Sequence, residues 1–451
     1  MSVDGKSPRR CDDAANKGPG GGWPTLLLAT IGFVTIVITA HAALAIDRFD
    51  IATYVAMDMA HGALYLAAVL LVLNCGNAGA RAFTIIFVVA IVLRGLAATP
   101  APNLSTDAYR YVWDARIQAA GFNPYVHVPA DPRLAHLRDA EIYPRINQKE
   151  NAVTIYPPAA QLVFRAARAF DAGLEGIGVV MLLADAVIVL ALLGLLKQLG
   201  QPRERVILYA WHPLPIYEIA TQSHIDAAAT AVLMLALLAA AKKRQALGGA
   251  LLAVATLVKL FPVIAAPVLW RRWDWRAPAA FVGIAALLYA PFAWSAGGRV
   301  FGYLGRHLDN EGYAAGWGFH PIWLMRDLGI GDPPAAVYLA LAALAMTGLS
   351  LWALVARAAD DIRWQRLLLI GAGFVWLASP HYPWYFLFLV PLATLTPSAA
   401  ALSMTLLAPL LYLPRPPGGI TWTEIYLAVY WLPLVVLATE IAWRRYGERR
   451  I

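Results

Sequence analysis

The stretch Ser105-Thr-Asp-Ala-Tyr-Arg-Tyr-Val-Trp-Asp-Ala-Arg116 comes directly after a long apolar run and lies in the hydrophilic segment 103–164. This segment continues through Gly121-Phe-Asn-Pro-Tyr125 and includes Thr154-Ile-Tyr-Pro-Pro158. A polar helix that directly follows a membrane-crossing run is expected at the surface of the bilayer. We therefore expect this segment to rest on a bundle of membrane-spanning helices.

A helix over residues 105–119 would carry one polar face, because steps of three, four and four residues stay in register. The side chains on this face are Asp107, Arg110, Asp114 and Gln118. In one interpretation, a carboxylate held there beside cations and aromatic rings deprotonates a hydroxyl acceptor next to a lipid-bound phosphate. In the other, Arg110 pairs with Asp107 and Asp114 along a solvated helix. The spacing is compatible with both.

The composition indicates a membrane protein. Charged residues make up only 14% of the 451 residues, hydrophobic residues make up 60%, and the mean hydropathy is +0.59. A soluble protein carries about a quarter charged residues, and the alternating pattern of a membrane β-barrel is missing. We therefore predict an all-α polytopic membrane protein. The net charge of +8 lies in short clusters beside apolar runs, which is typical of membrane topology and not of nucleic-acid binding.

About 12 apolar runs, most near the length of about 17–25 residues that a bilayer requires, are predicted as transmembrane helices. They are residues 24–46, 53–75, 82–99, 177–199, 205–221, 225–241, 277–296, 335–356, 364–379, 381–396, 399–413 and 422–443. Basic clusters recur on one side of these runs, and the positive-inside bias places that side in the cytoplasm. Both termini are then expected in the cytoplasm and the active site outside it, in a protein of the inner (cytoplasmic) membrane.

The expected domain organisation is simple. We expect a disordered cytoplasmic tail over 1–22, one membrane domain over 23–445 whose residues 100–176 form a large extracytoplasmic catalytic loop, and a cytoplasmic tail over 446–451. Cys11 and Cys75 have neither disulfide nor metal-ligand spacing, and no nucleotide-binding motif occurs. We expect no cofactor and no metal. An enzyme that works outside the cytoplasm without a nucleotide donor needs an activated substrate carried by a lipid.

Residues 246–270 do not fit a simple crossing, because basic clusters flank them on both ends. We expect a re-entrant hairpin broken at Lys259-Leu-Phe-Pro262, where proline removes a backbone donor. Lys259 is then either a ligand-binding cation or the buried partner of a carboxylate. Among other charges inside the spans, we expect Arg94 to reach lipid headgroups, and Asp58 to pair with His61 three residues later.

Polar residues of several outer turns are expected to converge with Asp107 on one extracytoplasmic cavity. These residues are Glu218, His224, Asp226, His320 and His381. A plainer interpretation exists for the two last histidines, which lie among aromatic residues and prolines and would then be capped residues of the membrane interface.

The motifs Ser105–Arg116, Gly121–Tyr125 and Tyr156-Pro-Pro158 resemble those of the GT-C glycosyltransferases, and among these they look like the polyprenol-phosphate-mannose-dependent mannosyltransferases of glycosyltransferase family 87. Ser223-His-Ile-Asp226 resembles the family's Gly-His-Asn-Asp turn, with Ile in place of Asn. Residues 257–262 resemble its Lys-x-x-Pro segment. The resemblance implies a GT-C-like bundle of about a dozen spans, extracytoplasmic amphipathic helices and a catalytic Asp in the first large outer loop.

The resemblance also implies the roles of individual residues. Asp107 matches the general base and Asp114 the second acidic position of an inverting transfer, with mannose favoured. Residues expected to bind the phosphate or sugar of a polyprenyl-phosphate donor are Arg110, Tyr156, Lys259, His320 and His381. Residues expected to line the acceptor side or the cavity are Arg116, Glu218, His224 and Asp226. The expected partners are this donor, a lipid, glycan or protein acceptor, and membrane lipids.

Two other functions would also use an outward-facing polar cavity. One is a transporter or flippase of lipid-linked sugars, and the other is a catalytically silent scaffold of an envelope assembly. Transporters usually contain paired repeats, and none is visible in this sequence. The single large loop with an acid-bearing helix favours an enzyme.

Overall fold

The computed structural model describes residues 23–74, 79–271, 273–303, 309, 311–355, 364–415 and 419–448. Within these residues the chain forms helices and no strands, which confirms the all-α class. Seven of their helices are long and apolar enough to cross a membrane. They are α2 (Trp23–Asp47), α3 (Ile51–Asn74), α4 (Gly79–Ala97), α7 (Leu174–Gln198), α13 (Arg276–Ala296), α16 (Ala335–Val355) and the run formed by α20 (Trp422–Tyr426), η9 (Leu427–Trp431) and α21 (Leu432–Glu448).

Shorter apolar helices fill the bundle between the long ones. They are α10 (Asp226–Ala241), α11 (Gln245–Val258), α17 (Trp364–Ala378), η7 (Pro383–Phe386) with α18 (Leu389–Leu395), and α19 (Ala399–Leu407) with η8 (Ala408–Tyr412). The expected tail 1–22 lies outside the described residues. The expected tail 446–451 begins inside α21, which continues to Glu448.

The apolar run 205–221 is not the single helix that its hydropathy predicts. It forms η3 (Arg203–Val206), α8 (Ile207–Ala210), α9 (Pro213–Pro215) and the π-helical η4 (Ile216–Thr221), and the segment is buried from Val206 onward. Pro213 and Pro215 lack the backbone N–H that a continuous helix needs. The ring nitrogen Nδ1 of His212 accepts the free N–H of Leu214 at 3.2 Å. The number of about 12 spans stays a prediction.

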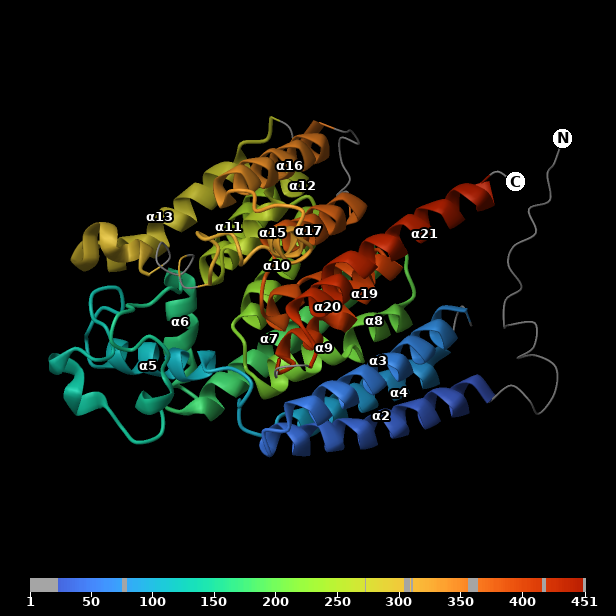
Figure 1. The fold of residues 1–451 in the computed structure, drawn as a ribbon, viewed down its shortest axis with the longest axis horizontal. Coiled ribbons are helices and arrows are strands. Elements are labelled where there is room, and N and C mark those ends of the chain that lie inside the picture. Colours follow the sequence, from blue (N-terminus) through green and yellow to red (C-terminus); the bar gives the residue numbers. More distant parts are fainter. Residues whose placement is uncertain are drawn as a thin grey trace.

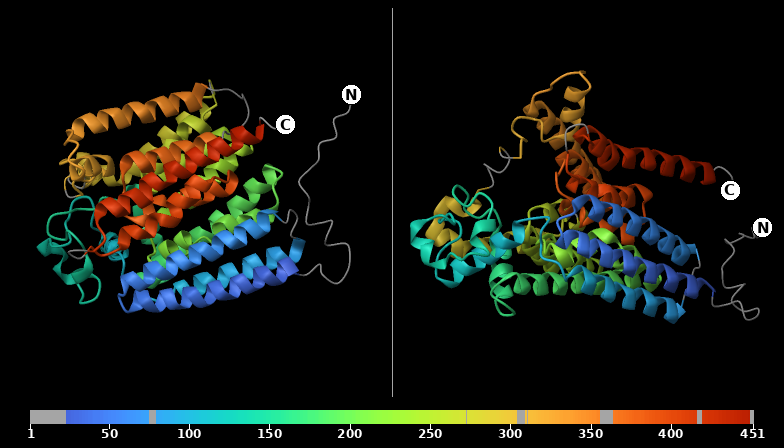
Figure 2. Two further views of the ribbon diagram at one scale, coloured as in Figure 1. Left: turned by 45° about the vertical axis from the view of Figure 1, so that its right-hand side comes forward. Right: turned by 60° about the horizontal axis from the view of Figure 1, so that its bottom comes forward.

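The long helices run roughly along one direction, and the polar segment between α4 and α7 gathers at one end of them (Figure 1). That segment contains α5 (Asp107–Ala119), η1 (Pro132–Leu137), η2 (Tyr143–Arg145) and α6 (Pro158–Ala167). Figure 2 shows in both views that this segment lies at the end opposite the C-terminal end of α21. Helices α2, α3 and α4 pack together, while α10 packs against both α7 and α11.

The sequence predicts that Arg94 reaches lipid headgroups. In the structure it instead forms an ion pair with Asp185 that joins α4 to α7. Arg94 Nη1 also donates to the Ala210 carbonyl oxygen at 2.7 Å, and the Tyr209 hydroxyl donates to Asp185 at 2.5 Å. The prediction is wrong because a charge inside the bundle is stabilised more by a buried partner than by a stretched path to the interface.

The predicted pair of Asp58 and His61 is also wrong. The His61 ring turns toward the broken segment, where Nε2 lies 3.1 Å from the Trp211 carbonyl oxygen and Nδ1 lies 3.4 Å from the Thr39 hydroxyl. Neither carboxylate oxygen of Asp58 has a hydrogen-bond partner among the described residues. The Trp211 carbonyl, which the interruption of the helix leaves without an intrahelical partner, is an acceptor that sequence spacing does not reveal.

The predicted break at Lys259 is confirmed. Helix α11 ends at Val258, and Lys259 has an extended backbone with φ −150° and ψ 142°. The chain then continues as η5 (Phe261–Ala265) and α12 (Ala266–Leu269), which pack back against α11. Pro262 lies in the first turn of η5, where its missing N–H is tolerated. The break places the lysine at a helix end and not along a helix face.

The contact between α11 and α13 generates a test of this packing. A Cβ atom on Gly249 would lie 2.1 Å from the Ala277 carbonyl oxygen, whereas one on Gly283 of α13 would meet no atom within 4 Å. Gly249→Ala should force the two helices apart and destabilise the protein by about 1–3 kcal/mol. Gly283→Ala gains the same helix propensity without a clash, so it should leave stability unchanged or raise it.

The thermal midpoint of unfolding, Tm, of both variants in detergent measures this difference. A Gly249→Ala protein as stable as Gly283→Ala would contradict the close approach of α11 and α13.

Candidate active site

Asp107 is the first residue of α5, which begins two residues later than predicted. The Ser105 hydroxyl oxygen accepts the Asp107 backbone N–H at 3.2 Å and satisfies one of the free donors of the first turn. Helix α5 ends just before Gly121, whose φ of +83° is favourable for glycine. Contacts with α6 and α7 fix the helix on the bundle. The Asp107 side chain is only partly buried.

Arg110 and Asp114 lie on the predicted polar face, but this face is buried and not solvated. Arg110 Nε donates to Asp114 at 2.8 Å, and Arg110 Nη1 donates to the Ala152 carbonyl oxygen at 3.1 Å. The second Asp114 oxygen accepts from Gln161 of α6 at 3.0 Å. The pair therefore joins α5 to α6 and to the chain before α6. This geometry suits a residue pair that positions α5.

Arg116 and His320 are likewise held by protein contacts. Arg116 pairs with Asp139 at 2.5 Å and donates to the Leu137 carbonyl oxygen at 3.0 Å, so it anchors the outer segment. His320 is fully buried, with Nε2 3.0 Å from the Trp376 carbonyl oxygen and its ring stacked on Tyr430 at 4.2 Å. Burial lowers the pKa of His320 to about 3, so this ring is neutral at physiological pH.

Three other predicted site residues, Tyr156, Lys259 and Asp226, come together around Asp107. The Tyr156 hydroxyl forms a hydrogen bond with the Asp107 carboxylate, and the charges of Lys259 and Asp226 act on it from the bundle. Burial raises the pKa of the Asp107 carboxyl, and the nearby carboxylates of Asp226 and Glu311 act in the same direction. Lys259 and Tyr156 oppose this rise. A carboxylate with a raised pKa is a stronger base than a solvated one.

Lys259 is paired with a carboxylate, one of the two alternatives that the sequence leaves open. Its Nζ lies 2.6 Å and 2.8 Å from the two oxygens of Asp226, the first residue of α10. The same Nζ lies 4.1 Å from the centre of the Tyr385 ring. The Lys259 side chain is 16% exposed, so the pair lies at the edge of the site and is not sealed in the bundle.

A second layer lies beneath this pair. His224 Nδ1 is 2.8 Å from Glu218 Oε2, an ion-pair distance without the alignment of a hydrogen bond. The His224 ring stacks on Trp384 at 4.0 Å, and the Tyr412 hydroxyl contacts both Glu218 oxygens at 3.1 Å. Glu218, His224 and Asp226 therefore support the site from below, where they hold Lys259 and the aromatic residues.

Glu311 is a site residue that the sequence analysis does not single out. Its Oε2 lies 3.4 Å from His381 Nδ1, and His381 Nε2 lies 2.8 Å from the Gly318 carbonyl oxygen. The Tyr382 hydroxyl interacts with Glu311 and is within electrostatic reach of Asp107. The available signal in the sequence is an acidic residue directly before Gly312-Tyr313, in the outer loop that leads to His320. Loops between α13 and α16 thus contribute one wall of the site.

Comparison with known proteins identifies the family. Residues 154–380, about half of the chain, match the family described as Glycosyltransferase family 87. The chain belongs to glycosyltransferase family 87. Neither a curated protein nor a solved structure matches it. The family 87 match includes Tyr156, Asp226, Lys259 and Glu311, whereas Asp107 lies outside it. This family 87 member is an enzyme that transfers sugars, which confirms the predicted enzyme class over the transporter and the scaffold.

The raised pKa of Asp107 predicts a pH-dependent stability of this family 87 enzyme. The folded protein keeps this carboxyl protonated to a higher pH than the unfolded chain, whose carboxyl titrates near pH 4. The folded state therefore binds more protons just above pH 4, and its stability falls as pH rises through that window. Asp107→Asn removes this loss, so its Tm relative to wild type should rise between pH 4 and pH 7. A difference in Tm that is constant or falls with pH would contradict the raised pKa.

The Lys259–Asp226 pair predicts a non-additive mutational effect. Lys259→Met leaves the buried Asp226 carboxylate without its cation and should destabilise the protein by about 3–5 kcal/mol. Lys259→Met combined with Asp226→Asn removes both charges and should recover much of that loss. Denaturation of the two single variants and the double variant measures the coupling, and simple additivity would argue against the pair.

Proposed function

We propose that this family 87 glycosyltransferase takes its sugar, with mannose favoured, from a polyprenyl-phosphate donor and transfers it to an acceptor hydroxyl with Asp107 as general base. The observation that carries the proposal is the environment of Asp107. A partly exposed carboxylate with a raised pKa lies beside a tyrosine hydroxyl and a lysine, at the end of a membrane bundle. A general base must be accessible to its substrate and must accept a proton readily. The partial exposure of Asp107 favours the first, and its raised pKa favours the second.

The proposed reaction is a single displacement. The acceptor oxygen forms a bond to the anomeric carbon while the bond from that carbon to the phosphate oxygen breaks. The hydroxyl proton passes to Asp107, and the electron pair of the broken bond stays on the phosphate. Attack from the side opposite the leaving group inverts the anomeric configuration.

Other residues support this chemistry in distinct ways. Tyr156 orients the Asp107 carboxylate through its hydrogen bond. We assign Lys259 and His381 to the donor side of the site, where Asp226 holds Lys259 and Glu311 contacts His381. Glu218 and His224 support the site through their contacts with each other and with Trp384. Asp114, Arg110 and Arg116 hold α5 and the outer segment through their ion pairs. His320 contributes packing between α15 (His320–Asp327) and η9.

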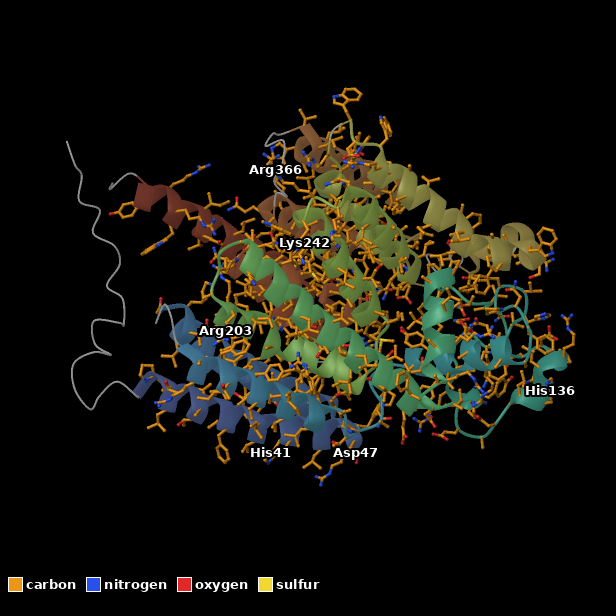
Figure 3. All side chains as sticks on the ribbon, turned by 180° about the vertical axis from the view of Figure 1, so that it is seen from behind. His41, Asp47, His136, Arg203, Lys242 and Arg366 are labelled. Atoms are coloured by element: carbon orange, nitrogen blue, oxygen red, sulfur yellow. The ribbon has the colours of Figure 1, made fainter. Side chains whose placement is uncertain are left out.

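We also propose that the active site faces outward from the cytoplasmic membrane. Figure 3 shows the labelled Arg203, Lys242 and Arg366 toward the end of the bundle where α21 finishes, and His136 at the opposite end with the segment that carries Asp107. The positive-inside bias assigns the first end to the cytoplasm. A lipid-linked donor would then present its sugar at the outer surface, within reach of Asp107.

Replacement of the base tests the proposal most simply. Asp107→Asn keeps the size of the side chain but cannot accept the proton, so turnover should fall by about 10²–10⁴-fold. Transfer of radiolabelled sugar from a polyprenyl-phosphate donor, measured with purified enzyme in proteoliposomes, gives the rate. Asp332→Asn, at an exposed carboxylate paired with Arg326, is the matched control and should retain wild-type activity. An active Asp107→Asn enzyme would reject Asp107 as the base.

A further inference from the structure

Among the described residues, the charges around Asp107 include no cation that is free to bind the phosphate of a donor. The carboxylates of Asp226 and Glu311 both lie within electrostatic reach of Asp107. Lys259 is the nearby cation, and both oxygens of Asp226 already hold its ammonium group. A phosphate placed here meets net negative charge, and its negative charge grows as the bond to the sugar breaks. An anion in a crowded, poorly solvated site needs a cation whose charge is not already compensated.

The two predicted arginines of the outer segment and His320 do not meet this need. Arg110 is buried in its pair with Asp114, and Arg116 is paired with Asp139. His320 is neutral and fully buried. The phosphate-binding roles that the sequence suggests for Arg110 and His320 would require these contacts to open.

Arg415 is different from these residues. It lies in the outer connection between η8 and α20, and its side chain is exposed. Its guanidinium carbon lies 3.7 Å from the centre of the Trp422 ring, and its Nη1 donates to the Leu413 carbonyl oxygen at 3.0 Å. Among the described residues, no carboxylate forms an ion pair with it. The indole holds the flat face of the guanidinium and leaves most of its N–H donors open.

Arg415 belongs to the rim of the same site. The Tyr382 hydroxyl lies within electrostatic reach of Arg415 as well as of Asp107 and Glu311. The Trp422 ring that holds Arg415 lies 6.1 Å from the ring of His381, which in turn contacts Glu311. Arg415 and Asp107 therefore both border one aromatic wall, formed by Tyr382, Trp422 and His381.

We propose that Arg415 binds the phosphate of the lipid-linked donor, with Trp422 holding the guanidinium against the aromatic wall. The inference rests on the proposed function, since it names the cation for the phosphate that this function requires. Arginine suits this task because its planar fork can donate two parallel hydrogen bonds to one phosphate, which lysine cannot do. The phosphate then lies at the rim near Arg415, and the sugar extends from it toward Asp107.

Binding of a short-chain prenyl phosphate, the leaving group of the proposed reaction, tests this role without relying on turnover. Arg415→Gln should weaken binding by about 10- to 100-fold, because charge-assisted hydrogen bonds to the phosphate are lost. Arg415→Lys keeps the charge but not the fork and should bind with intermediate affinity. Arg48→Gln removes an exposed outer arginine elsewhere and should bind like wild type. Calorimetric titration of the detergent-solubilised proteins gives each dissociation constant.

Further arms of the experiment separate the sources of the phosphate. Inorganic phosphate tests the anion alone, and nanodiscs with or without phosphatidylglycerol test an ordinary lipid headgroup. The proposal expects the loss in Arg415→Gln to be specific to the prenyl phosphate. A loss confined to phosphatidylglycerol, or equal prenyl phosphate affinity in Arg415→Gln and wild type, would overturn the role of Arg415. Failure of the wild type itself to bind prenyl phosphate would overturn the proposed donor as well.

Discussion

The ion pair between Lys259 and Asp226 is the interaction on which the rest of the site depends. It joins the first residue of α10 to the break between α11 and η5, two places where the regular helical backbone stops. An unpaired charge in the bundle would raise the free energy of the folded protein, and each residue neutralises the charge of the other. The pair also brings the broken hairpin next to the start of α5, and it supplies the positive charge that limits the rise in the pKa of Asp107.

The polar segment between α4 and α7 is fixed by its own buried pairs and not by the membrane bundle alone. Arg110 and Asp114 tie α5 to α6, and Arg116 ties α5 to the turn around Asp139. Aromatic contacts add to this, since Tyr111 stacks on Phe164 at 4.5 Å. These contacts fix the position of the segment, and they keep the carboxylate of Asp107 partly buried but accessible. Such an environment raises the free energy of the charged carboxylate and therefore its pKa. A higher pKa makes the carboxylate a stronger base toward a hydroxyl proton.

The sequence was sufficient for the features that depend on hydropathy and on local chemistry. Apolar runs predict the long helices, the spacing 107–110–114 predicts the polar face of α5, and Pro262 predicts the break at Lys259. The pairings across the bundle were not predictable. Arg94 and Asp185 are 91 residues apart, so sequence spacing gives no sign that they meet. Asp58 and His61 are close in sequence, which favours a pair, but the His61 ring contacts the Trp211 carbonyl instead. Glu311 and Arg415 were missed for a related reason, since a single charged residue in an outer loop acquires its role only from the walls that meet it in the fold.

The central claim is that Asp107 receives the proton of an acceptor hydroxyl beside a sugar delivered on a lipid phosphate. A structure of the enzyme with an unreactive polyprenyl-phosphate sugar and an acceptor bound would test it most directly. The account predicts an acceptor oxygen about 3 Å from the Asp107 carboxylate, on the face of the sugar opposite the phosphate. An acceptor oxygen held by a different base, or a sugar bound at the other end of the bundle, would contradict it.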